Sequence, residues 1–274
     1  MRPVRSILLL CVALSFVAAA GAVSAARVKS AARGRPTAAG SARKHAAGDT
    51  SRVHIGPADG GTTAFVAWPA GAGPAPGVIV VHEWWGLNGQ IRQVARRLAR
   101  EGYVAIVPDL YHGAVTDDPE KAHELMRGLE DDAAIADLDA AIAWLRAQPA
   151  TAKSRLGVVG FCMGGRYSEL LDLHSRALSA AVMFYGPPVV DPKKLATLAA
   201  PLQGHFGSED QVIPAAKVES LRAGLGQAGK EGVVYVYAGA GHAFMNEQRP
   251  SYHADAARQA WSRTLGFLQK HLKY

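Results

Sequence analysis

The sequence has 274 residues, of which 49% are hydrophobic, so it is long enough to bury the core of one large domain or two small ones. Its formal net charge of +7 resides in residues 1–50, which hold eight Lys or Arg and one Asp, while the remainder carries 22 basic and 22 acidic groups. The basic balance therefore belongs to the N-terminal segment and does not indicate a nucleic-acid-binding face on the rest of the chain.

Residues 1–25 have the pattern of a secretory signal peptide. Arg2 and Arg5 precede an apolar run from Ile7 to Ala20, and the small residues AVSAA follow it. A membrane anchor, the alternative, requires an apolar run of roughly 18 to 20 residues, and this run is shorter. We therefore expect cleavage after Ala25 and a secreted or periplasmic protein whose mature chain has no transmembrane span.

Residues 26–50 are rich in Ala, Gly, Ser, Arg and Lys and contain no aromatic side chain. Such a segment has too little apolar surface to fold, so we expect a flexible basic tail followed by a single domain over 51–274. A solvated linker is the simplest role for this tail, and contact with anionic membrane or cell-wall polymers is the alternative.

Strand and helix patterns alternate along the rest of the chain. Residues 62–68 alternate as a strand does, and 77–82 form a continuous β-branched run typical of a strand buried on both faces. Further strands are predicted at 103–111 (with its exit loop), 155–161, 178–186, 200–207 and 232–239, and helices at 90–101, 118–129, 134–148, 164–175, 214–228 and 254–271. This alternation predicts an α/β fold with a mostly parallel sheet and helices on both faces.

Four side chains with catalytic chemistry follow predicted strands. Glu83 follows the strand 77–82, Cys162 follows 155–161, Asp210 follows 200–207, and His242 follows 232–239. Ligand sites in open α/β sheets lie beyond the carboxyl ends of the strands, so we expect these side chains to lie near one another. A carboxylate at the end of a buried strand, such as Glu83, is costly without a partner, and a structural ion pair is its alternative role.

Cys162 stands in a G-x-C-x-G-G pattern between a strand and a helix, which is the form of a nucleophile elbow with a thiol in place of the hydroxyl. Gly160 and Gly164 would let strand and helix approach closely, and the helix N-terminus would stabilise a thiolate. Cleavage of the signal removes Cys11, so Cys162 would have no partner for a disulfide within the chain. A bridge to another chain and a buried, inert thiol are the alternatives.

His242 and Asp210 follow the nucleophile in the order that elbow hydrolases use, which is nucleophile, acid, histidine. His242 would serve as the base, and Asp210 would accept its ring N–H and hold its tautomer. The neighbouring Glu209 is the competing carboxylate, and a surface histidine is the competing interpretation of His242.

Six motifs together resemble the dienelactone hydrolase family of α/β-hydrolases over most of residues 52–274. They are VVHEWWGLN (80–88), GYVAIVPDLY (102–111), VGFCMGG (159–165), FYG (184–186), GSEDQVIP (207–214) and GAGHAF (239–244). The resemblance implies a triad of Cys162, Asp210 and His242. It also implies that Glu83 is an extra catalytic carboxylate that interacts with the nucleophile and helps to govern its thiol or thiolate state.

The oxyanion hole is expected at the backbone N–H groups of Met163 and Trp84. Aromatic side chains near the motifs could form the substrate pocket, although large aromatics near a sheet edge are more often plain core. The side chains that we expect at this pocket are Trp85, Tyr111, Tyr185 and Asn246.

The family's namesake enzymes bind a substrate carboxylate with two arginines. Asn246 occupies the place of one of them here, and the stretch DDPEKAHELM (117–126) has no arginine for the other. Lys121 and Arg127 are the alternative cations for this role, so the sequence does not define the substrate.

These observations predict an exported hydrolase of small-molecule esters or lactones that forms an acyl-thiol intermediate and acts as a monomer. We expect no cofactor and no metal, because the adjacent His82 and Glu83 would point to opposite faces of a strand. A broad carboxylesterase or thioesterase acting on an envelope substrate is one alternative. A non-catalytic ligand-binding protein with the same fold is the other.

Overall fold

The structure, a computed structural model, describes residues 45–46, 48–71 and 73–274. The predicted signal peptide and residues 26–44 of the predicted tail lie outside these ranges. No helix within the described ranges is long and apolar enough to cross a membrane.

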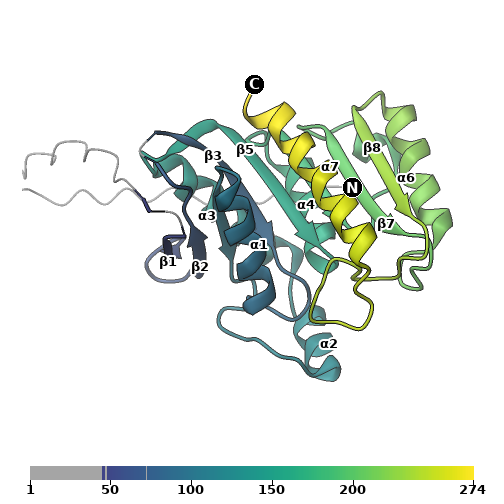
Figure 1. Cartoon of the computed structure of the whole chain (residues 1–274), viewed down its shortest axis with the longest axis horizontal. Coiled ribbons are helices and arrows are strands. Elements are labelled where there is room, and N and C mark those ends of the chain that lie inside the picture. Colours follow the sequence, from purple (N-terminus) through teal and green to yellow (C-terminus); the bar gives the residue numbers. More distant parts are fainter. Residues whose placement is uncertain (1–44, 47, 72) are drawn as a thin grey trace, which may run out of the picture. The chain divides into compact units, whose positions relative to one another are not determined.

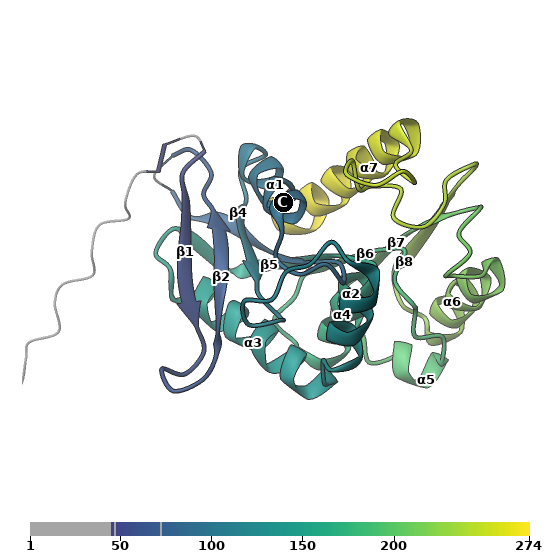
Figure 2. The same cartoon turned by 90° about the horizontal axis from the view of Figure 1, so that it is seen from below.

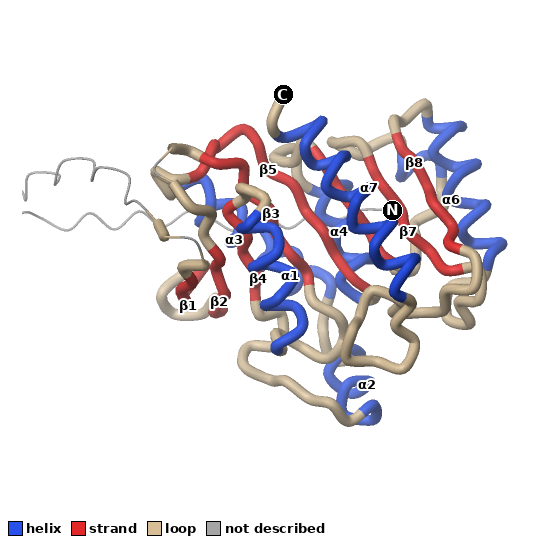
Figure 3. The backbone as a smooth tube through the Cα atoms, in the orientation of Figure 1, coloured by secondary structure: helices blue, strands red, loops and turns tan. Residues whose placement is uncertain are grey.

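One sheet runs through this part of the chain (Figure 1, Figure 3). Its strands are β1 (Thr50–Ile55), β2 (Thr62–Ala67), β3 (Ala75–Val81), β4 (Val104–Pro108), β5 (Thr151–Phe161), β6 (Ala180–Phe184), β7 (Leu202–Gly207) and β8 (Gly232–Tyr237). Their order across the sheet is β1-β2-β4-β3-β5-β6-β7-β8. β2 pairs antiparallel with β1 and with β4, and every other neighbouring pair is parallel. Every residue of β4 and β6 is buried, which explains their continuous apolar sequences.

Helices cover both faces of the sheet (Figure 2). They are α1 (Gly89–Arg100), α2 (Pro119–Arg127), α3 (Asp131–Ala147), α4 (Met163–His174), α5 (Pro192–Leu195), α6 (Ala215–Ala228) and α7 (Ala254–Leu272). A cluster that includes Leu98 and Trp261 joins α1 and α7 to one face, and a second that includes Leu138, Leu171 and Leu221 joins α3, α4 and α6 to the other. The predicted α/β architecture is thereby confirmed.

The sequence patterns missed β1 and the four-residue α5. β1 lies at the edge of the sheet, and Ile55 is its only fully buried residue, so it lacks the apolar signal of the central strands. β5 also begins at Thr151, earlier than the predicted 155, because Thr151 and Ala152 pair with the start of β3 before an irregularity in register.

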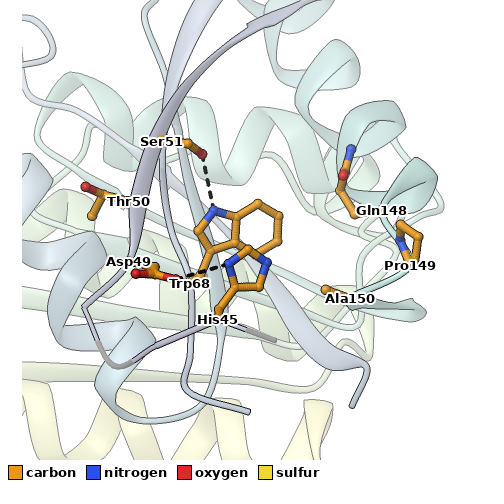
Figure 4. A pocket seen from close by; sticks show the side chains of 8 residues that line it. All are labelled: His45, Asp49, Thr50, Ser51, Trp68, Gln148, Pro149 and Ala150. Atoms are coloured by element: carbon orange, nitrogen blue, oxygen red, sulfur yellow. Dashed lines mark hydrogen bonds and ion pairs between the residues drawn. The ribbon is translucent and has the colours of Figure 1, made fainter. Parts of the chain in front are cut away.

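The residues that precede β1 contact the domain beside Trp68 (Figure 4). His45 stacks on the indole of Trp68 with ring centroids 4.1 Å apart, and the indole N–H donates to Ser51 Oγ at 3.2 Å. Gln148 and Pro149 line the same cavity of about 440 Å³. These two residues precede β5, whereas the cysteine predicted to be the nucleophile follows it, so this cavity lies at the opposite end of that strand.

Two glycines allow the close approach of α4 to the sheet. A Cβ on Gly160 would collide with the carbonyl oxygen of Gly164, and a Cβ on Gly164 would collide with that of Val81. All of these partner atoms belong to backbone and cannot move aside easily. The predicted elbow glycines are therefore required by the contact between β5, β3 and the first turn of α4.

We expect Gly160→Ala to lower the free energy of unfolding by about 3 kcal/mol, because the added methyl overpacks this contact. Urea denaturation measures the change. Gly226→Ala is the matched control: a Cβ there meets no atom within 4 Å, and alanine favours the helix by about 1 kcal/mol. Equal stabilities of Gly160→Ala and the wild type would contradict the account.

Candidate active site

Cys162 lies on a strained turn between β5 and α4. Its backbone has φ 53° and ψ −117°, a conformation that L-residues rarely adopt, and its N–H donates to the carbonyl of Phe184 at 2.9 Å. The residue precedes the first turn of α4, where free N–H groups and the helix dipole favour a negative charge. The turn therefore holds the thiol at the N-terminus of α4.

The structure brings the three predicted triad residues together. His242 Nε2 lies 3.2 Å from Cys162 Sγ, and His242 Nδ1 lies 2.9 Å from Asp210 Oδ2. The other carboxylate oxygen of Asp210 accepts the N–H groups of Val212 and Ile213 at 2.8 and 2.9 Å. Asp210 is thus held rigidly against the imidazole, whereas the competing carboxylate of Glu209 is exposed to solvent.

The imidazole of His242 is strongly biased toward its charged form. Burial lowers its pKa, but hydrogen bonds to Asp210 and Cys162 and the negative charges of both groups outweigh burial and raise the pKa to about 10. The hydrogen bond to Asp210 is the largest of the contributions that raise this pKa. The geometry therefore holds the imidazole between Asp210 and Cys162, where its charged form is stabilised.

Two backbone N–H groups near Cys162 have no hydrogen-bond partner among the described residues. They belong to Trp84, in the loop after β3, and to Met163, the first residue of α4. The N–H of Met163 is free because the first turn of a helix has no preceding carbonyl to accept it. These are the two donors that the sequence predicts for an oxyanion hole.

Glu83 is buried, with 4% of its surface exposed, and two neutral donors hold its carboxylate. Asn246 Nδ2 donates to Oε2 at 2.6 Å and the Tyr185 hydroxyl donates to Oε1 at 3.2 Å. Burial raises the pKa of Glu83, while these hydrogen bonds and the nearby charges of His242 and Arg249 partly oppose the rise. Within the described part of the chain, no hydrogen bond joins Glu83 to Cys162.

A cavity of about 550 Å³ opens over Cys162 and His242. Its walls are mostly apolar, and the rings of Trp85 and His123 meet the ring of Trp84 edge-on at 4.8 and 4.9 Å. The volume and lining are typical of a site for a small molecule. Trp85, which the sequence analysis expects at the pocket, lines this cavity together with Trp84.

Three other residues predicted for the pocket do not line this cavity. Tyr185 and Asn246 are buried and bind Glu83, as described above, and the Tyr111 hydroxyl donates to Met163 Sδ at 3.2 Å. Their polar tips are bonded to residues of the cavity wall, so they support the wall rather than contact a ligand.

Two arginines that the sequence patterns did not single out line the cavity. The guanidinium of Arg249 lies 3.6 Å from the ring centroid of Trp85, and Arg166 forms two hydrogen bonds of 2.7 Å with Asp131. Arg166 follows the nucleophile by one helical turn, which is a signal that could have identified it. Arg249 lies in an irregular loop seven residues beyond His242, where no periodicity in the sequence indicates which way a side chain points.

Within the described residues, no group of three or more His, Cys, Asp or Glu side chains could hold a metal ion.

The chain is similar in sequence and structure to known hydrolases. The model of the dienelactone hydrolase family matches residues 62–272. A candidate carboxymethylenebutenolidase of Methylorubrum extorquens is 36% identical, covering 80% of each chain, and one of Escherichia coli K12 is 38% identical, covering 73% of this chain and 78% of its own. The crystal structure of a candidate dienelactone hydrolase from Klebsiella pneumoniae superposes with a TM-score of 0.76 at 34% identity, covering 81% of this chain and 98% of its own.

Each of these relatives spans most of this chain, and the matched region runs from β2 to the end of α7 and so contains the elbow, the histidine and both carboxylates. On the strength of the family match, the sequence identity and the shared fold, this chain belongs to the dienelactone hydrolase family.

Proposed function

We propose that this protein hydrolyses carboxylic ester or lactone bonds through an acyl-thiol intermediate on Cys162. The contact chain from Cys162 Sγ to His242 and from His242 to Asp210, with distances of 3.2 and 2.9 Å, is the observation that carries the proposal. Family membership and the names of the similar proteins support the class of bond.

In the acylation half of the reaction, the thiolate of Cys162 attacks the carbonyl carbon. The oxyanion that forms accepts hydrogen bonds from the N–H groups of Met163 and Trp84. When the tetrahedral intermediate collapses, the carbon–oxygen bond of the ester breaks and His242 gives its Nε2 proton to the leaving alkoxide. In a lactone the alcohol stays attached to the acyl group, because the two parts belong to one ring and only the ester bond between them breaks.

In the deacylation half, His242 is neutral and its Nε2 accepts a proton from water. The hydroxide attacks the thioester carbonyl, the carbon–sulfur bond breaks, and Cys162 leaves as a thiolate beside the new imidazolium. Asp210 keeps the tautomer of His242 correct in both halves, since it always accepts from Nδ1. The carboxylic acid product then leaves with the starting ion pair restored.

The cavity favours a substrate with a small apolar or unsaturated body. Trp84 and Trp85 offer aromatic faces, and Arg249 could pair with an acidic substituent. Arg166 is less available for this role, because both ends of its guanidinium bind Asp131. The substrate class is therefore proposed as small esters and lactones, with Arg249 supplying preference for an anionic group.

Residues 1–25 support a second part of the proposal, namely that the protein is exported and its signal peptide cleaved. Expression in a bacterial host with fractionation of the cells tests it. We expect the periplasm or medium to contain a protein whose N-terminal peptide begins at Ala26. A full-length protein retained in the cytoplasm would exclude export.

We expect Cys162→Ala to reduce kcat by about 10³-fold or more, because it removes the attacking atom while the oxyanion donors remain. The assay panel contains p-nitrophenyl esters, neutral lactones, cis-dienelactone and acyl thioesters. Lys153→Ala, an exposed charge on β5 outside the cavity, is the control and should retain activity. Turnover that survives in Cys162→Ala would refute the nucleophile. Failure of the wild type on every substrate class would favour a binding protein.

We expect Asn246→Leu to move the acid limb of the kcat/KM profile to higher pH. The substitution removes a donor that holds the pKa of Glu83 down, so this pKa rises further. The carboxylate then protonates at higher pH, and His242 loses the nearby negative charge that stabilises its imidazolium as the pH falls. Gln248→Leu, at an exposed position in the same loop, is the control. An unchanged acid limb in Asn246→Leu would show that Glu83 does not set it.

A further inference from the structure

A second cavity, of about 530 Å³, lies at the antiparallel edge of the sheet. Arg52 and His54 of β1 and Arg92 of α1 line it, together with the loop that contains Asp109 and Val115. We call this cavity the basic edge pocket. It shares no lining residue with the cavity over Cys162, so it is a separate site within the described part of the chain.

A further arginine lies next to the basic edge pocket. Arg52 is directly opposite Phe65 in the β1–β2 pairing, and the guanidinium of Arg96 lies 4.9 Å from the centroid of the Phe65 ring. Arg96 is also one turn along α1 from Arg92, which lines the pocket. Three guanidinium groups and the imidazoles of His54 and His112 are thus gathered at one edge of a domain whose acidic and basic residues balance overall.

Carboxylates do not neutralise the three arginines among the described residues, whereas the imidazole of His112 pairs with Asp137 Oδ2 at 2.8 Å. None of Arg52, Arg92 and Arg96 lies within 4.0 Å of an Asp or Glu oxygen there. Asp109 is the one carboxylate among the residues that line the pocket, and its oxygens accept backbone N–H groups of Tyr111 and Gly113 at 3.2 and 2.9 Å. The pocket therefore has a local excess of positive charge.

We propose that the basic edge pocket binds a small polyanion that carries two or more phosphate groups. One guanidinium group can bind two oxygens of the same phosphate at once. Two arginines that line one cavity therefore suit a ligand with at least two negative groups. The volume lies in the range of small-molecule sites, and a single phosphate would leave most of it empty. The site is independent of the proposed hydrolysis, because it uses none of the residues of the triad.

Calorimetric titration of the protein with inorganic pyrophosphate, at constant ionic strength, tests the proposal. We expect saturable binding that Arg52→Gln with Arg92→Gln weakens at least about tenfold, because both substitutions remove charged hydrogen bonds to the anion. Arg100→Gln with Lys153→Gln removes the same charge at exposed positions outside the pocket, and binding should be retained. Both double variants keep the basic N-terminal segment, so any pyrophosphate that this segment binds contributes equally to the two titrations.

Two further arms make the outcome specific. Arg249→Gln should bind pyrophosphate as the wild type does, and thermal unfolding without ligand should confirm that every variant is folded. Equal weakening in both double variants would mean a diffuse charge effect and overturn the proposal. Loss of binding in Arg249→Gln would place the anion in the cavity over Cys162 instead, and absence of saturable binding to the wild type would likewise overturn it.

Discussion

The approach of the first turn of α4 to the ends of β3 and β6 is the constraint on which the site depends. Gly164 packs against the carbonyl of Val81, and a Cβ on Gly165 would lie 2.6 Å from the carbonyl oxygen of Phe184, so no larger residue fits either place. This approach leaves Cys162 with a positive φ and holds its sulfur 3.2 Å from His242 Nε2. The strain is maintained by buried packing on both faces of the sheet, which a local turn could not supply alone.

Charge in the site is organised around one imidazole. Asp210 and the thiol of Cys162 contact the two nitrogens of His242 directly, and Glu83 is a further negative group close enough to influence it. Glu83 is held by the neutral donors of Asn246 and Tyr185, so it can be buried without a salt bridge. Since Asn246 belongs to the loop that follows His242, the same hydrogen bond also ties the histidine loop to the end of β3.

The sequence predicts the parts of the site that local geometry determines. A nucleophile elbow is a short pattern of glycines at the end of an apolar strand, and the carboxyl ends of parallel strands bring Asp210 and His242 to the same edge, so these predictions carry over to the structure. The partners of Glu83 and the position of Arg249 depend on irregular loops whose path no periodicity encodes. The same reason explains why Tyr111, Tyr185 and Asn246 were expected in the pocket but support its wall, and why the solvent-exposed β1 was missed.

The most direct test of the central claim, attack by the Cys162 thiolate on a carbonyl, is mass spectrometry of the protein quenched with acid during turnover of an activated ester. The account predicts a species heavier by the mass of one acyl group, with the modification mapped to the peptide that contains Cys162. Acylation of another residue, or steady turnover with every Cys162 peptide unmodified even when deacylation is slowed by a hindered acyl group, would contradict it.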